Sequence, residues 1–149
     1  MKFNKWLIII FILTIFIWSQ SFLSGELSSQ ESGFITMQLV KILNFVQIDV
    51  NIDQLHIVIR KLAHFTEYFI LSMFWLIYLI KSKIINIKNI IYILLIILMT
   101  AIIDEAIQLL HDDRSSSLID VVIDFGGAII GIVVFMLCKM LYNRHVKNI

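Results

Sequence analysis

The chain has 149 residues, of which 60% are hydrophobic and 15% are charged, with a formal net charge of +1 and a mean hydropathy of +0.93. Soluble domains are about half apolar and about a quarter charged, so this composition excludes a soluble fold and predicts a single all-α membrane domain over residues 1–149. We expect the lipid bilayer as a partner and no nucleic acid, and the single cysteine, Cys138, implies neither a disulfide nor a metal cluster. The composition does not predict an oligomeric state.

Four apolar blocks predict a bundle of four membrane-spanning helices, because about 20 mostly apolar residues are needed to cross a hydrocarbon core of roughly 30 Å. The spans are placed at about 5–23, 62–80, 84–103 and 118–141. The first block is short and follows Lys2 and Lys5, as in a cleavable signal. No small-x-small cleavage site follows Trp18, which favours a retained helix.

The first connection divides into a polar part and an amphipathic part. Residues 19–32, SQSFLSGELSSQES, are interpreted as an outer loop. Residues 33–47 combine apolar side chains with a narrow polar stripe, which predicts a helix lying in the outer membrane interface or packing on the bundle. Asp53 is then expected to cap a long helix that begins near Gln54.

The segment RKLAHFTEYF places ionisable groups in the second span. One arc of roughly 80° holds the stripe His56, Arg60, His64 and Glu67. Ionisable groups at membrane depth are costly unless they face a partner or a water-filled cavity, so His64 and Glu67 are expected inside the bundle. Arg60 and Lys61 are expected at its rim, where anchoring by snorkelling is the alternative.

The third predicted helix ends with a comparable group. In TAIIDEAIQLLHD one face holds Thr100, Asp104, Gln108 and His111, and Glu105 lies about 100° from Asp104. Four apolar residues follow the two adjacent carboxylates, so at least one of them is expected inside the protein. Surface charge is the alternative interpretation.

The fourth predicted helix has a polar face that continues into two glycines. This face holds Ser117, Asp120, Asp124, Gly127 and Gly131. Ser116 or Ser117 can cap the helix, and Asp120 suits its positive end. Asp124 lies one turn further in and has no such role, while Gly127 and Gly131 predict close helix packing.

The charges also predict an orientation in the membrane. The N-terminus, the connection between the second and third spans and the tail hold eight of the 12 basic residues and no acid: Lys2, Lys5, Lys81, Lys83, Lys88, Lys139, Arg144 and Lys147. All 11 acidic residues lie in the other two connections or at the helix ends beside them. Lys and Arg near span ends are retained in the cytoplasm, so both termini are predicted inside.

Together these residues predict one polar cluster in the outer third of the bundle. Its cations could hold a phosphate or carboxylate of a lipid-linked or cell-wall precursor. Alternatively, its His and carboxylates could bind a divalent metal, or act as acid and base in an enzyme. A purely structural bundle with internally paired charges is the third interpretation. No Cys/His cluster of zinc type occurs in the sequence, so no residue is assigned as a metal ligand and the cofactor is unknown.

The motifs R-K-x-x-H-F-x-E-Y, D-E-x-x-Q and R-S-x-S-x-x-D-V-x-x-D-x-x-G-x-x-x-G resemble those of the VanZ-like membrane proteins, roughly over residues 5–140. The matching positions are Arg60, Lys61, His64, Glu67, Tyr68, Asp104, Glu105, Gln108, Arg114, Ser115, Asp120, Gly127 and Gly131. The family usually has Asn where this chain has Asp124, and Pro-Gly where it has Asp112 and Asp113.

One member of that family accompanies a vancomycin-type resistance cluster and is associated with low-level teicoplanin resistance. The resemblance therefore implies a multi-pass protein of the bacterial cytoplasmic membrane that influences susceptibility to glycopeptide or lipoglycopeptide antibiotics. It implies no particular mechanism and leaves open whether the protein is an enzyme.

Overall fold

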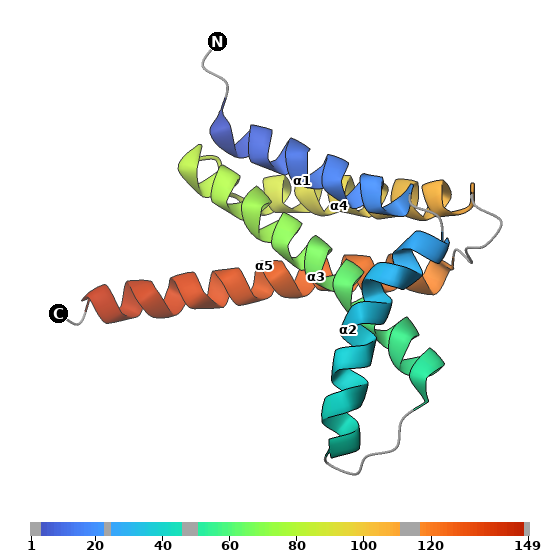
Figure 1. The fold of residues 1–149 in the computed structure, drawn as a ribbon. Coiled ribbons are helices and arrows are strands. Elements are labelled where there is room, and N and C mark those ends of the chain that lie inside the picture. Colours follow the sequence, from blue (N-terminus) through green and yellow to red (C-terminus); the bar gives the residue numbers. More distant parts are fainter. Residues whose placement is uncertain (1–3, 23–24, 46–50, 111–116, 148–149) are drawn as a thin grey trace.

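The computed structural model describes residues 4–22, 25–45, 51–110 and 117–147, and within the helices it describes all side chains except those of 25–32 and 147. The described residues form α-helices and no strand, as predicted. The helices are α1 (Lys5–Ser21), α2 (Gly25–Phe45), α3 (Ile52–Lys81), α4 (Ile87–Gln108) and α5 (Leu118–Lys147) (Figure 1). Helices α3, α4 and α5 are long and apolar enough to cross a membrane, and α1 is a shorter apolar helix.

Asparagine side chains define where three of the helices begin. The Asn51 side chain accepts a hydrogen bond from the backbone N–H of Gln54, and Asn4 and Asn86 cap α1 and α4 in the same way. The expectation that Asp53 caps the long helix is therefore wrong. Asp53 lies within the first turn of α3, where its negative charge favours the positive end of the helix dipole.

The polar stretch 19–32 is largely helical, so its interpretation as a loop is wrong. Helix α1 continues to Ser21 and α2 already begins at Gly25. The stretch contains no proline, and its Glu, Leu and Gln residues are compatible with helix, so polarity alone did not predict a break. The consequence for the site is that Ser21 lies on a helix and its side chain is completely buried.

Helix α3 is the centre of the fold, because it packs against each of the other four helices. Its most extensive contact is with α5, where small residues allow the two backbones to approach. A methyl group on Gly127 would collide with the backbone oxygen of Phe65, and one on Gly131 would lie 2.6 Å from the backbone oxygen of Phe69. The close α3–α5 contact therefore depends on these two glycines.

The buried apolar core fills the space between α1, α3, α4 and α5. Its members are Ile10, Ile17, Tyr68, Leu71, Leu76, Leu79, Ile93, Ile97, Ala101, Ala128 and Ile132. Many large apolar side chains on the outer faces of these helices are exposed, as expected for surfaces in contact with lipid.

The start of α1, the turn between α3 and α4, and the end of α5 lie toward the same end of the molecule (Figure 1). The side-chain amide of Asn4 donates a hydrogen bond to Ser82 Oγ at 3.2 Å, which ties the start of α1 to the end of α3. In the turn, the backbone N–H of Ile84 bonds to the carbonyl of Leu79, with Lys83 in the left-handed conformation at φ 58°. The basic residues of these segments therefore gather at one end.

Candidate functional site

Polar side chains from three helices meet at the other end of the core, between α3, α4 and α5. We call His64, Glu67, Tyr68, Asp104 and Asp124 the polar cluster. His64 Nδ1 lies 3.4 Å from Glu67 Oε2 and 3.8 Å from Asp104 Oδ2. One ligand-type atom from each of His64, Asp104 and Asp124 lies within 4.8 Å of the others. Residues distant in sequence thus form a single buried site.

The cluster is buried and its hydrogen bonding is incomplete. Asp104 and Tyr68 are 0% exposed and Asp124 is 2% exposed. Among the described residues, five of its buried atoms have no hydrogen-bond partner, namely His64 Nδ1, Glu67 Oε2, Tyr68 Oη, Asp104 Oδ2 and Asp124 Oδ2. Buried polar groups in folded proteins are almost always hydrogen-bonded, so five such atoms in one place require an explanation beyond packing.

Helix α1 supports the cluster through Ser21, which sequence reasoning did not assign to the site. Ser21 Oγ donates a 2.7 Å hydrogen bond to Asp104 Oδ1, and Gln108 Nε2 lies 3.4 Å from Ser21 Oγ and donates to it. The available signal was the spacing Ile10, Ile17 and Ser21, which places all three on one helix face. The apolar members of that face belong to the core.

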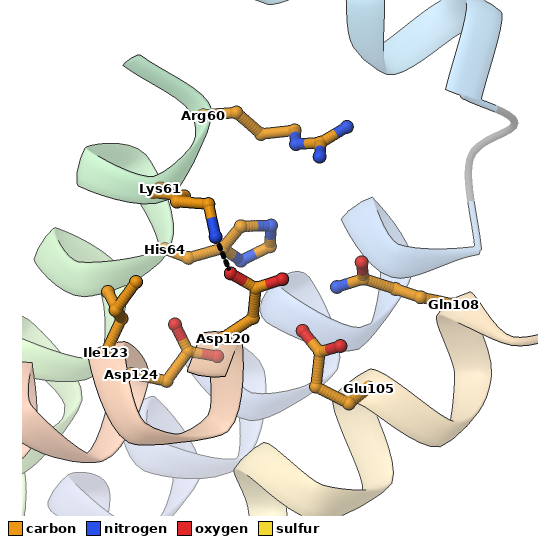
Figure 2. Close-up of a pocket in the computed structure, with 8 residues that line it drawn as sticks. All are labelled: Arg60, Lys61, His64, Glu105, Gln108, Asp120, Ile123 and Asp124. Carbon is orange, nitrogen blue, oxygen red and sulfur yellow. Dashed lines mark hydrogen bonds and ion pairs between the residues drawn. The ribbon is translucent and has the colours of Figure 1, made fainter. Parts of the chain in front are cut away.

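A small cleft adjoins the cluster and is lined by Arg60, Lys61, His64, Glu105, Gln108, Asp120, Ile123 and Asp124. Figure 2 shows Arg60 at one side of this cleft and the carboxylates of Glu105, Asp120 and Asp124 at the other, with His64 between them. Both cations come from adjacent positions of α3, and the acids come from α4 and α5. Positively and negatively charged side chains therefore both line the cleft beside the cluster.

The two cations of the cleft differ in their partners. Lys61 forms an ion pair with Asp120 across the α3–α5 contact (Figure 2). Arg60 has no ion pair with any acid in the described part of the chain. Of the two, Arg60 is therefore the cation whose charge is left for another group.

Glu105 is buried, and its carboxylate connects the end of α4 to the start of α5. Its Oε2 accepts a 3.1 Å hydrogen bond from the backbone N–H of Ser117, immediately before α5. Ser117 Oγ in turn accepts from the backbone N–H of Ile119, as expected for a helix cap. Glu105 and Ser117 therefore fix the end of α4 against the start of α5.

The structure places most of the predicted site residues around this one site. The cluster and its cleft include Arg60, Lys61, His64, Glu67, Tyr68, Asp104, Glu105, Gln108, Asp120 and Asp124. Arg114 and Ser115 lie outside the described residues, as do His111 and Ser116. Gly127 and Gly131 lie at the α3–α5 contact beside the site.

The fold and the site define a class of protein: an all-helical membrane protein with a buried His-carboxylate cluster beside a charged cleft. The sequence matches the family described as VanZ/LLP1 over residues 6–139, nearly the whole chain, and the protein belongs to this VanZ-like family. Neither the curated proteins nor the solved structures include a significant match to the chain.

Proposed function

We propose that the chain is a four-span protein of the bacterial cytoplasmic membrane with both termini in the cytoplasm. In this proposal α1 crosses the membrane in addition to α3, α4 and α5. Helix α1 has 17 residues, or about 26 Å at 1.5 Å per residue, which approaches the thickness of a hydrocarbon core. Support for the orientation comes from the start of α1, the α3–α4 turn and the end of α5, which carry basic residues in the sequence and lie toward one end of the molecule (Figure 1). The cleft is lined from the first half of α3, the end of α4 and the start of α5. The cleft then faces the outer side.

Helix α2 is proposed to lie in the outer interface. It crosses α3 and runs away from the other helices (Figure 1). Phe34, Ile35, Met37 and Phe45 are exposed along it, whereas Thr36 is buried. An exposed apolar face on a helix that is not enclosed by the bundle suits contact with lipid.

The proposed activity is the binding of an anionic group of a lipid-linked or cell-wall precursor in the cleft. This binding would change the susceptibility of the cell to glycopeptide or lipoglycopeptide antibiotics. The observation that carries the proposal is Arg60, which lines the cleft without an ion pair in the described residues while the neighbouring Lys61 is neutralised by Asp120. A guanidinium binds phosphate or carboxylate through two parallel hydrogen bonds, so Arg60 suits such a ligand.

The test is to complement a deletion of the gene in its native host. Strains with the wild-type chain, with Arg60→Ala and with Arg144→Ala are compared for teicoplanin susceptibility at matched protein levels. Arg144 is the control because it is an exposed arginine near the end of α5, remote in sequence and structure from the cleft. We expect Arg60→Ala to behave as the deletion and Arg144→Ala as the wild type. Equal susceptibility of all strains, including the deletion strain, would contradict the proposed function.

An intramembrane enzyme acting on such a precursor is the second candidate. It is favoured by His64, which contacts two carboxylates and also lines the cleft, as an acid or base near a substrate would. Lipid extracts of the same strains separate the two candidates. A binding protein leaves the chemical structure of the precursors unchanged, whereas an enzyme requires that the deletion strain accumulate an unconverted one.

A purely structural bundle with internally paired charges receives less support. Such a bundle requires that the buried polar groups satisfy one another, because an unpaired one destabilises the fold. In the described residues the cluster leaves five buried atoms without hydrogen-bond partners, although His64 Nδ1 lies 3.4 Å from Glu67 and 3.8 Å from Asp104.

A further inference from the structure

We propose that the polar cluster binds one divalent transition-metal ion, Zn²⁺ or Mn²⁺, through His64, Asp104 and Asp124. Their ligand-type atoms lie within 4.8 Å of one another. Metal–ligand bonds of about 2.0–2.2 Å place two ligand atoms of a tetrahedral ion roughly 3.3–3.6 Å apart. Side-chain movements that bring each pair of atoms closer by about 1 Å are therefore sufficient for all three to reach one ion.

The hydrogen bonding of the cluster independently supports the binding of a cation. Asp104 and Asp124 are at most 2% exposed, and in each of them Oδ2 has no hydrogen-bond partner among the described residues. Nδ1 of His64, between α3 and α4, is likewise buried and not hydrogen-bonded. Buried charges are stable only when they are paired or bound to a metal. Here the unpartnered atoms are of the kinds that bind metals.

The charges near the site favour a divalent ion over a side-chain cation. Lys61 is already paired with Asp120, and Arg60 forms no ion pair with the cluster in the described chain. Glu67 Oε2 lies 3.4 Å from His64 Nδ1 and adds a third carboxylate beside the three ligand residues. One divalent cation would offset two of these three negative charges at once.

The donor set indicates which metals are bound. Calcium and magnesium prefer sites made only of oxygen, whereas an imidazole nitrogen together with carboxylates suits Zn²⁺ and neighbouring transition metals, Mn²⁺ included where carboxylates dominate. The 2.7 Å hydrogen bond from Ser21 to Asp104 Oδ1 leaves Oδ2 as the free oxygen. Hydrogen bonds of this kind orient ligands in metal sites. The cleft beside His64 and Asp124 supplies a route of entry.

This inference does not depend on the proposed role in antibiotic susceptibility, because metal binding is measured on the isolated protein. The full chain is purified in detergent, stripped with a chelator, passed through a desalting column and titrated with ZnCl₂ or MnCl₂ by calorimetry. Elemental analysis after equilibrium dialysis gives the stoichiometry. We expect one ion per chain for at least one of the two metals.

Asp124→Asn is the decisive variant, because it keeps the size of the side chain and removes the charge of one ligand. We expect it to weaken binding at least about tenfold, and His64→Ala to abolish it. The matched control is Asp53→Asn, an exposed aspartate in the first turn of α3 outside the site, which should keep both the stoichiometry and the affinity. Circular dichroism identifies any variant that does not fold.

X-ray absorption of the metal-loaded wild-type protein provides a test that requires no variant. We expect only nitrogen and oxygen ligands, with an imidazole contribution. Three results would overturn the proposal: no binding of either metal at millimolar concentration, a spectrum without imidazole, or equal affinity in the wild type and in folded His64→Ala and Asp124→Asn.

Discussion

Along α3 the buried side chains change character within two turns. Leu71, Leu76 and Leu79 pack into an apolar core against α1, α4 and α5, whereas His64 contacts Glu67 of its own helix and faces carboxylates of α4 and α5. The apolar region is held by close packing, and beside the polar cluster a methyl group on Gly127 or Gly131 would collide with the backbone oxygen of Phe65 or Phe69. The polar region is more open, with the His64 and Glu67 side chains 18% and 23% exposed, and it leaves buried atoms without hydrogen-bond partners.

This difference indicates that the two regions serve different ends. Close packing is the main source of stability for helices in lipid, because there is no hydrophobic effect between them. Buried charges that are incompletely paired reduce stability, which supports our proposal that this region binds a ligand. Substitutions in the apolar region should therefore lower stability, and substitutions of the cluster ligands should change binding with little loss of stability.

The largest expected effect on stability is in the α3–α5 contact. Gly127→Ala should lower the free energy of unfolding by about 3 kcal/mol, because the added methyl group meets the backbone oxygen of Phe65, which cannot move aside as a side chain can. Denaturant titration in mixed micelles measures the change.

Gly126 provides the matched control for this prediction. A Cβ atom at Gly126 meets nothing within 4 Å, so Gly126→Ala should leave stability unchanged or raise it by up to about 1 kcal/mol through helix propensity. Equal destabilisation by the two adjacent substitutions would show that the glycines act through backbone flexibility and not through packing.

A smaller effect on stability is expected at Ser21, through which α1 contacts the polar cluster. Ser21→Ala removes the donor to Asp104 Oδ1 and leaves a second oxygen of a buried carboxylate without that partner. The expected loss is about 1.5 kcal/mol, measured by the same titration in the presence of a chelator. Ser19→Ala is the control, because Ser19 is exposed and bonds to the backbone of its own helix. A loss as large in Ser19→Ala would contradict a specific role for Ser21.

Much of the site could be predicted from the sequence, because helical periodicity is a local property. The spacing of Thr100, Asp104 and Gln108 predicted one face, and the structure buries all three. In α5 the spacing of Asp124, Gly127 and Gly131 likewise predicted one face, which the structure turns toward α3. Which residues of one helix share a face can therefore be predicted without knowledge of the fold.

What the sequence could not provide is the rotation of one helix against another. Arg60 and Lys61 are neighbours of similar chemistry, and only the packed structure shows that Lys61 pairs with Asp120 while Arg60 does not. Ser21 was overlooked for a related reason: polarity suggested a loop, while its burial depends on α1 lying against α4. The start of α3 was misplaced because Asn51 and Asp53 are both good caps, and spacing alone did not distinguish them.

We propose that the polar cluster holds a cation and does not hold the fold together. The most direct measurement is the thermal unfolding of wild-type protein and Asp124→Asn, each in chelator and in the metal that binds. In chelator we expect the variant to melt at or above the temperature of the wild type, since it has lost a buried charge. We expect the metal to raise only the wild-type melting temperature substantially. A variant that is clearly less stable in chelator, together with a wild type that does not respond to Zn²⁺ or Mn²⁺, would contradict it.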